Sequence, residues 1–281
     1  MGVLLNMKRL LSILLLLSAL TTFSQKGDSW ATVKTKGSGT VAILYYDQPG
    51  LIFKAPDGKM KGVCADIITD FQKFIETKYG KKITILYVGE EKDFPKFLTT
   101  IQQTNNLLGV TNTSITEERK KIMKFSPSFM NNQVILLTNK NAPSIKSLSE
   151  IPVAFKGFKA QVITGSTHVP HIEKIKKEYY PELVIEYVPG GDEIIKNLST
   201  DPRLFSVIDF TEYIGVIRRK IPVKKQEIDL GHPEPLGFIM SKQSDWDGPW
   251  KEFLTDDYRK SVRYKEIIAE NLGSSFLSLV R

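Results

Sequence analysis

Hydrophobic and polar positions follow two alternating patterns along this chain. Short apolar runs are typical of buried strands, and longer stretches with apolar residues three and four positions apart are typical of amphipathic helices. In the first part of the chain the pattern predicts strands and helices in alternation, at 40–47, 64–80, 81–88, 94–104 and 106–111. This order predicts a largely parallel sheet with helices on its faces.

The predicted helix at 64–80 has the clearest periodicity. Its apolar face is formed by residues spaced three and four apart, namely Ile67, Ile68, Phe71, Phe74, Ile75 and Lys78. Gly80 follows, and glycine commonly adopts the left-handed conformation that ends a helix. The polar segment 27–39, before the first strand, is expected to be a loose linker.

The strand and helix pattern restarts in the second half of the chain. Strands are expected at the end of 147–163 and at 183–188 and 205–209, with helices at 165–180, 191–199 and 210–220. Residues 235–273 add one strand and two helices, which we expect to pack back on the first half.

The sequence therefore predicts an α/β protein with two lobes, each a mostly parallel sheet flanked by helices. The first lobe is expected to combine residues 40–135 and 232–281, and the second to span 136–231. Two hinge crossings are expected near 136–140 and 222–231. Lobes of this kind face each other across a cleft, where ligands bind beyond the carboxyl ends of the strands.

The N-terminus has the pattern of a secretory signal peptide. A basic start at Lys8 and Arg9 precedes an apolar run over 10–20, and small residues lead to a cleavage site expected after Ser24. A membrane anchor is the alternative, but the run is shorter than the ~20 residues that span a bilayer. No cysteine lies near the cleavage site, which argues against a lipid anchor. Residues 1–24 are thus predicted to be a signal peptide, 25–39 a linker, and the protein periplasmic.

Composition narrows the class of protein. The chain is 41% hydrophobic and 25% charged, as in ordinary globular proteins. Its single cysteine, Cys64, cannot form an internal disulfide and is expected to be a packed core residue. The formal charge of +8 falls to +6 when the predicted signal peptide, with Lys8 and Arg9, is removed. The lysines are spread along the chain. A solvated basic surface explains this better than nucleic-acid binding, for which no recognition motif is present.

Candidate chemistry is concentrated at the ends of three predicted strands. After the strand at 106–111 come Asn112 and Ser114, and then a short helix that Thr116 is expected to cap. Arg119 lies in the first turn of that helix, where the helix dipole disfavours a cation. From spacing alone, Arg119 is either a solvated residue balanced by two glutamates or the partner of a bound anion.

The second strand end leads into Gly165, Ser166 and Thr167, with Pro170 at a first helical position. Free N–H groups at such a helix start bind carboxylates or phosphates, although a well-capped helix is an equally good interpretation.

Asp209 closes the third strand end, just before a helix. It either caps that helix or faces the cleft as an anionic partner. A guanidinium and a helix start suit a carboxylate, and an aspartate suits an ammonium. Together the three strand ends match a zwitterionic α-amino acid, whose charges leave water favourably only when each meets an opposite charge.

Over residues 40–254 the sequence resembles the bacterial extracellular solute-binding proteins of family 3, the periplasmic receptors of amino-acid ABC importers. The resemblance is carried by three segments, "DGKMKGVCADI", "TNTSITEERKKIMKFSPSF" and "SLSEIPVAFKGFKAQVITGST". It implies that Arg119 binds the ligand carboxylate and that Asp209 pairs with the ammonium. The other residues that it places at the ligand are Asn112, through its backbone carbonyl, Ser114, Gly165, Ser166, Thr167 and the aromatic Phe94.

The chain departs from the family's pattern around the expected side-chain pocket. One of the family's two aromatics in the segment 49–53 is missing, because Leu51 stands in its place while Phe53 is kept, and an acid usual before the second segment is Leu107 here. Tyr45, Tyr46 and Gln48, at the end of the first strand, are expected to reshape the pocket, with Tyr45 and Gln48 in contact with the ligand.

The predicted function is that of a non-catalytic, monomeric receptor that closes on an amino acid or a similar zwitterion and delivers it to a membrane ABC permease. No cofactor and no metal are expected, because the histidines are better explained as surface or capping residues. The alternatives are a sensory binding module and a dehydratase-like enzyme, for which Glu117, Glu118 and His168 are the candidate acids and bases.

Overall fold

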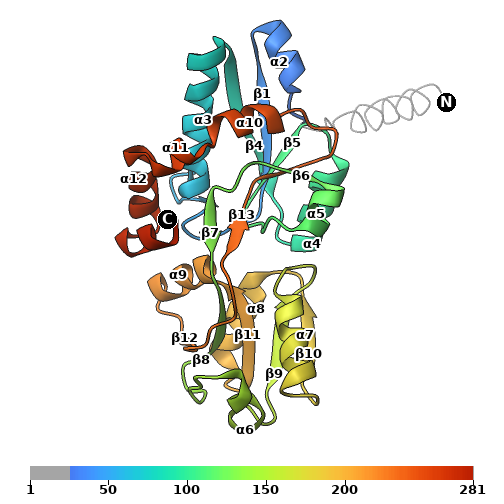
Figure 1. Cartoon of the computed structure of the whole chain (residues 1–281), viewed down its shortest axis with the longest axis vertical. Coiled ribbons are helices and arrows are strands. Elements are labelled where there is room, and N and C mark those ends of the chain that lie inside the picture. Colours follow the sequence, from blue (N-terminus) through green and yellow to red (C-terminus); the bar gives the residue numbers. More distant parts are fainter. Residues whose placement is uncertain (1–25, 281) are drawn as a thin grey trace, which may run out of the picture.

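The computed structural model describes residues 26–280, and the first of its two lobes is built on a five-stranded sheet (Figure 1). The strand order is β4 (Lys82–Glu90), β1 (Ser38–Tyr45), β5 (Leu107–Val110), β14 (Ile239–Met240) and β6 (Lys124–Phe125). Strand β1 runs parallel to β4 and β5, whereas β14 runs antiparallel to β5 and β6. The predicted alternation of strands and helices therefore produces the parallel part of the sheet.

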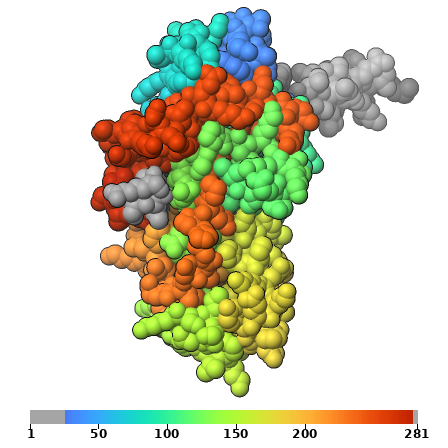
Figure 2. Space-filling model, viewed as in Figure 1, coloured from blue at the N-terminus to red at the C-terminus, as the bar shows by residue number. Residues whose placement is uncertain are grey.

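Helices and a small hairpin complete the first lobe. They are α2 (Trp30–Lys36), the hairpin β2 (Phe53–Lys54) and β3 (Met60–Lys61), α3 (Val63–Tyr79), α4 (Phe94–Gln103), α5 (Glu117–Ile122), α10 (Asp247–Phe253), α11 (Asp256–Lys260), α12 (Val262–Asn271) and the 3-10 helix η2 (Ser274–Val280). In Figure 2 the red C-terminal chain spreads over this lobe, as the sequence predicted.

The segment expected to be a loose linker contains helix α2 instead. Ser29 caps this helix by accepting a hydrogen bond from the Thr32 N–H, and Gly37 ends it at φ +84°. Trp30 and Val33 are buried, which anchors the helix on the first lobe. The apolar residues are only three apart and too few to show a periodicity among so many polar neighbours.

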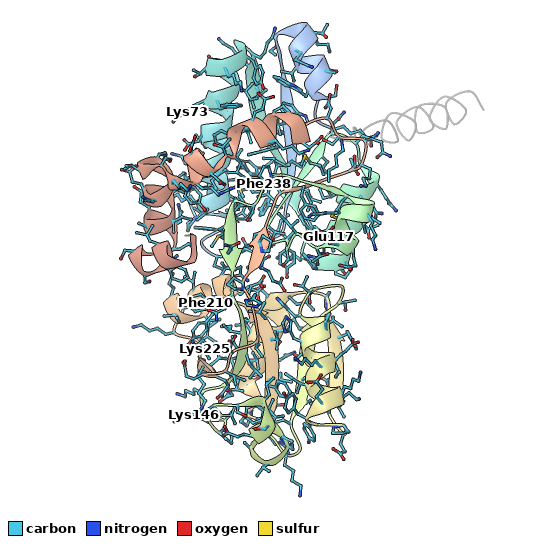
Figure 3. All side chains as sticks on the ribbon, in the orientation of Figure 1. Lys73, Glu117, Lys146, Phe210, Lys225 and Phe238 are labelled. Carbon is cyan, nitrogen blue, oxygen red and sulfur yellow. The ribbon has the colours of Figure 1, made fainter. Side chains whose placement is uncertain are left out.

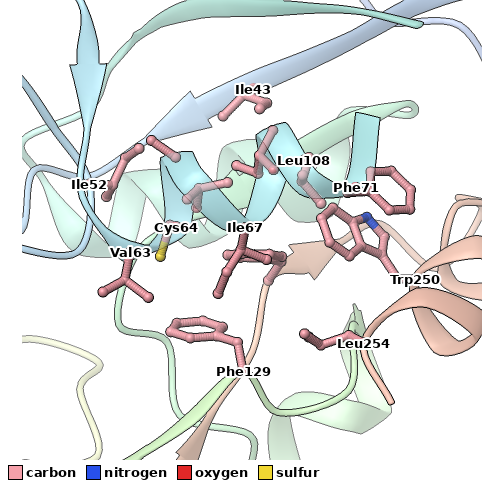
Figure 4. Packing of buried hydrophobic residues seen from close by; sticks show 14 of the residues in the cluster. Ile43, Ile52, Val63, Cys64, Ile67, Phe71, Leu108, Phe129, Trp250 and Leu254 are labelled. Atoms are coloured by element: carbon pink, nitrogen blue, oxygen red, sulfur yellow. The ribbon is translucent and has the colours of Figure 1, made fainter. Parts of the chain in front are cut away.

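Helix α3 packs at the centre of the first lobe's core (Figure 4). Phe71 stacks on Trp250 of α10 with ring centroids 3.8 Å apart. Gly80 has the left-handed conformation that was predicted, but Lys78 lies at the surface and pairs with Glu252. Cys64 is fully buried, and burial raises the pKa of its thiol, so it is the packed core residue that was expected.

The second lobe repeats the architecture with different connections. Its sheet has the order β10 (Val184–Val188), β9 (Lys159–Ile163), β11 (Leu204–Asp209), β8 (Val134–Asn139) and β12 (Val223–Lys225). The first three strands are mutually parallel, and β8 runs antiparallel to β11 and β12. Its helices are η1 (Leu148–Glu150), α6 (Ile151–Ala154), α7 (Val169–Glu178), α8 (Gly191–Thr200) and α9 (Phe210–Arg218).

Two extended segments, β7 (Met130–Asn132) and β13 (Glu234–Leu236), connect the lobes side by side (Figure 1). The crossings were expected near 136–140 and 222–231, but residues 136–139 and 223–225 belong to strands β8 and β12 of the second sheet. Strand β8 is buried along its whole length, so its apolar residues belong to the second lobe's core and not to a link. The chain crosses a few residues closer to the first lobe on both passes.

The two-lobed α/β prediction is confirmed, and the lobes are in contact. Phe210 of α9 lies where they meet (Figure 3) and stacks on Phe276 of η2, with centroids 5.2 Å apart. Within residues 26–280 we find no helix whose length and apolar character would let it cross a membrane. The predicted signal peptide lies outside the described residues.

Candidate binding site between the lobes

The carboxyl ends of the parallel strands of both sheets meet at the boundary between the lobes. The loops after β1 and β5 come from the first lobe, and those after β9 and β11 come from the second. They enclose a cavity of about 20 Å³. Seven of the residues expected at the ligand line it together, namely Phe94, Asn112, Ser114, Arg119, Ser166, Thr167 and Asp209.

Arg119 is buried at this cavity, with only 9% of its surface exposed. Thr116 caps helix α5 and accepts a hydrogen bond from the Arg119 N–H, as predicted. The guanidinium turns back from the helix and donates to the Ser114 carbonyl at 3.0 Å and, across the cleft, to the Gly165 carbonyl at 3.1 Å. It also lies over the Phe94 ring, 5.7 Å from the centroid. The solvated-surface interpretation of Arg119 is therefore wrong.

Within the described residues, the hydrogen bonds of the Arg119 guanidinium go to carbonyls and none goes to a carboxylate. Burial lowers the pKa of its guanidinium, while the carboxylates of Glu234 and Asp209 act in the opposite direction. The two groups that it contacts directly are neutral carbonyls. A carboxylate at the same place would form stronger, charge-assisted hydrogen bonds.

Asp209 faces the cavity and does not cap helix α9. It is 3% exposed and accepts hydrogen bonds from three side chains. Asn132 donates at 2.7 Å, His168 donates through Nε2 at 2.9 Å, and Asn112 donates from the other lobe. Of the two alternatives for Asp209, the side chain therefore takes the orientation into the cleft, where protein groups already satisfy it.

Gly165, Ser166 and Thr167 form the turn before helix α7, which begins at Val169, and Thr167 lies opposite Ser114. Gly165 has φ +71°, which suits glycine, and Ser166 turns its hydroxyl back onto the Ile163 carbonyl. The Thr167 hydroxyl lies 3.3 Å from the Ser114 hydroxyl and donates to Glu234 at 2.8 Å.

Glu234 belongs to strand β13, which pairs with β7 between the lobes, and was not expected at the site. Burial alone would raise its pKa, but the neighbouring His171, 3.9 Å away, the Ser114 hydroxyl and the hydrogen bond from Thr167 lower it to about 2. The Glu234 carboxylate therefore already lies against Ser114 and Thr167, two residues that were expected to hold the ligand. Its position could not be inferred from the sequence, because β13 is three residues long and carries no periodicity.

His168 was expected at the surface or at a helix cap, and it occupies the N-cap position of α7, although its side chain makes no capping hydrogen bond and is buried. It is 3% exposed and lies against Asp209. Burial lowers the pKa of its imidazole, but Asp209 and the nearby carboxylates of Glu212 and Glu234 outweigh burial and raise it. Across residues 26–280 no group of three or more His, Cys, Asp or Glu side chains is arranged to hold a metal ion.

At the expected side-chain pocket, Tyr46 lines the cavity in place of the predicted Tyr45. Tyr45 packs against Tyr87 within the first lobe, 6.3 Å between ring centroids, and does not line the cavity. Its neighbour Tyr46 does, because consecutive side chains of an extended chain point to opposite sides. Gln48 is buried in the interlobe contact and donates to Glu212 at 2.9 Å. Glu212, in the first turn of α9, is a further residue that the sequence did not reveal.

Backbone and side-chain hydrogen bonds hold the lobes closed around the cavity. The Gly191 N–H donates to the Tyr46 hydroxyl at 2.8 Å, and the Phe94 N–H donates to the Pro189 carbonyl at 2.9 Å. A cavity of about 20 Å³ has room for roughly one water molecule. Any larger ligand therefore enters only after the lobes have separated.

No protein-family model and no curated protein matches the sequence. Solved structures do match. An ancestral arginine-binding protein bound to glutamine is 24% identical with a TM-score of 0.65, over 83% of this chain and 98% of that one. A putative L-cystine ABC transporter from Listeria monocytogenes is 17% identical with a TM-score of 0.67, over 84% and 97%.

A third structure, the ancestral amino acid-binding protein AncCDT-1, a precursor of cyclohexadienyl dehydratase, is 22% identical with a TM-score of 0.63, over 86% of this chain and 98% of that one. At these identities the likeness establishes the fold. The chain has the two-lobed fold of amino-acid-binding proteins and of the substrate-binding components of ABC importers.

Proposed function

We propose that this protein is a solute-binding receptor that captures an amino acid, or a similar small zwitterion, between its lobes and delivers it to a membrane ABC importer. A single observation carries the proposal. Arg119 of the first lobe and Asp209 of the second line the same interlobe cavity, at the carboxyl ends of the parallel strands. Opposite charges on the two lobes suit a ligand that carries both charges.

In this proposal the ligand replaces protein groups that fill the closed site. A ligand carboxylate replaces the Ser114 and Gly165 carbonyls on Arg119 and gains the N–H groups at the start of α7. A ligand ammonium replaces one or more of the three donors on Asp209. Because these contacts come from both lobes, the ligand favours the closed state by the difference in its contacts between the closed and open states.

The β7–β13 pair is the proposed hinge. Residues of the binding stretch are tied to it, since the Ile115 N–H donates to the Pro235 carbonyl and the Gly237 N–H donates to the Thr113 carbonyl. Opening and closing therefore move the second lobe relative to a rigid unit of hinge and binding loop.

Export and partners complete the proposal. Residues 1–24 act as the signal peptide, the mature protein works as a monomer in the periplasm, and an importer in the membrane recognises the closed form. Solved structures with this fold, which include an ancestral arginine-binding protein and a putative L-cystine ABC transporter, support this assignment.

Calorimetric titration with a panel of amino acids tests the proposal. We expect Arg119→Ala to lose affinity for any amino acid that the protein binds by roughly 30-fold or more, since removal of one partner of a buried charge pair costs about 2–5 kcal/mol. Lys121→Ala, at an exposed position of the same helix, is the matched control and should bind like the original protein. Equal affinity of both variants would refute the assignment.

The contact between His168 and Asp209 favours a second candidate function, that of a dehydratase-like enzyme. His168 against Asp209 is a buried acid–base pair in the cleft, as a dehydratase-like enzyme needs, whereas Glu117 and Glu118 are exposed. Incubation with a bound ligand followed by product analysis separates the two functions. A receptor returns the ligand unchanged, and its melting temperature rises with ligand concentration.

A further inference from the structure

A second, larger cavity opens beside the inner one and has a volume of about 230 Å³. The loops that follow β1 and β4 form one wall, and the starts of α8 and α9 form the other. Tyr46 and Glu212 line both cavities, so the two spaces adjoin. A ligand held by its α-groups in the inner cavity extends its side chain into this outer one.

The outer cavity carries an excess of negative charge. Its lining includes two cations at the exposed rim, Lys92 and Arg219, and five carboxylates. Three of the carboxylates, Glu90, Asp192 and Glu193, are likewise exposed, and Glu90 pairs with Lys92 at 3.8 Å. Asp47 and Glu212 are the two that lie deeper in the cavity. Burial, together with the charges of Glu90 and Asp192, raises the pKa of Asp47 to about 6. The neighbouring carboxylates therefore make it harder for Asp47 to ionise. The nearby Arg219 and Lys92 act in the opposite direction without cancelling this effect.

The inner end of this cavity has hydrogen-bond acceptors without donors. Glu212 is 7% exposed, and its Oε1 accepts from Gln48, but its Oε2 has no partner within the described part of the chain. Gln48 is 3% exposed, and its Oε1 is likewise unpartnered there. A buried acceptor without a donor is costly and uncommon in folded proteins. When Glu212 is ionised, its Oε2 and the Gln48 Oε1 can each accept a hydrogen bond from a further donor.

We propose that the outer cavity binds the cationic end of the ligand's side chain, a primary ammonium or guanidinium group that donates to Glu212 and Gln48 and is flanked by Asp47. This rests on the proposed function, since Arg119 and Asp209 hold the ligand's α-groups. A neutral donor would satisfy the two acceptors but leave the charge excess, and an anion would meet repulsion. The substrate class is therefore a cationic amino acid.

Binding of a cation here releases protons. Glu212 faces Asp209, His168 and Asp192, and its pKa is about 7 because burial and the charge of Asp209 raise it. A cation beside the two carboxyls, Asp47 and Glu212, favours their charged forms and lowers their pKa values. At pH 6.5 the original protein is therefore expected to release protons when it binds L-arginine or L-lysine, but not when it binds the neutral analogues L-citrulline and L-norleucine.

Calorimetry in two buffers of different ionisation enthalpy measures both quantities on the original protein. We expect L-arginine and L-lysine to bind at least tenfold more tightly than their neutral analogues, and only the cationic ligands to give a buffer-dependent enthalpy. Glu212→Gln should reduce the preference for L-arginine over L-citrulline by tenfold or more. Glu182→Gln removes an exposed carboxylate that lines neither cavity and should keep the preference.

The outcomes separate this inference from the function on which it rests. If neutral and cationic amino acids bind equally well through Arg119, the cationic site is refuted and the receptor stands. If no amino acid binds at all, both are refuted. Because the ligand comparison uses the original protein, a folding defect in Glu212→Gln, which thermal unfolding detects, leaves the first test intact.

Discussion

Replacing Glu212 by glutamine should stabilise the protein, and should do so only above acidic pH. Glu212 lies in the first turn of α9 with its carboxyl buried in the interlobe contact. Burial and the negative charge of Asp209 raise its pKa from 4.5 to about 7, although His168 and the hydrogen bond from Gln48 act against the shift. The folded protein therefore resists the ionisation that the unfolded chain undergoes freely.

The magnitude follows from the shift. Below pH 4.5 the carboxyl is protonated in both states, so it contributes no pH dependence. Between pH 4.5 and about 7 the unfolded chain is ionised and the folded protein is not, so the free energy of unfolding falls as pH rises. At 1.36 kcal/mol per pH unit this amounts to about 3 kcal/mol. Glutamine does not titrate and fits the same space.

Urea unfolding at pH 4, 5, 6, 7 and 8 measures the effect. We expect Glu212→Gln to gain about 3 kcal/mol relative to the original protein between pH 4 and pH 8, as the linkage relation requires. Glu182→Gln, at an exposed position, controls for the loss of one carboxylate. Parallel stability curves for Glu212→Gln and the original protein would show that the carboxyl is not a buried, electrostatically strained group, and the reasoning would fail.

Three further predictions test the hinge, the core and the closed state. Glu234→Gln should lose about 2–3 kcal/mol of stability at pH 7, because the pKa of Glu234 is lowered to about 2; the loss should disappear as pH falls from 4.5 towards 2, and a pH-independent loss would contradict it. Phe71→Ala should lower the free energy of unfolding by about 3–5 kcal/mol, since it removes the ring stacked on Trp250. Phe276→Ala deletes the aromatic contact of the first lobe with Phe210. We expect the ligand-free protein to open and its radius of gyration in solution scattering to increase, whereas an unchanged radius would show that this contact does not hold the lobes.

The fold could be predicted from the sequence because its signals are local. The pattern of α3 and the apolar runs of the strands specify each element within a few residues, and their order implies the parallel sheets. The crossings could not be placed in this way. Residues of β8 look the same whether they form an apolar link or a buried strand, and only their pairing with β11, some 70 residues away, decides between the two.

Some of the candidate binding residues have local sequence signals, whereas others depend on contacts between distant parts of the chain. Asp209 and Thr167 stand at strand ends and helix starts, which sequence patterns reveal. The burial of Arg119 depends on the Gly165 carbonyl, which lies 46 residues further along the chain. Whether Tyr45 or Tyr46 faces the cleft depends on where β1 ends, and a shift of one residue reverses the answer. From the sequence alone, Glu212 looks like a residue on the polar face of a helix, and only the contact with the other lobe buries it.

The pairing of charges within the closed site indicates where selectivity arises. The ligand's carboxylate must compete with carbonyls on Arg119, and its ammonium must compete with the donors on Asp209. In each case the binding free energy gained is only the difference between the hydrogen bonds made to the ligand and the hydrogen bonds already made within the protein. The unpartnered oxygens of Gln48 and Glu212 have no such competitor in the described structure, so a donor that reaches them adds its full contribution. The α-groups would therefore position a ligand, while the outer cavity decides which side chain the lobes close on.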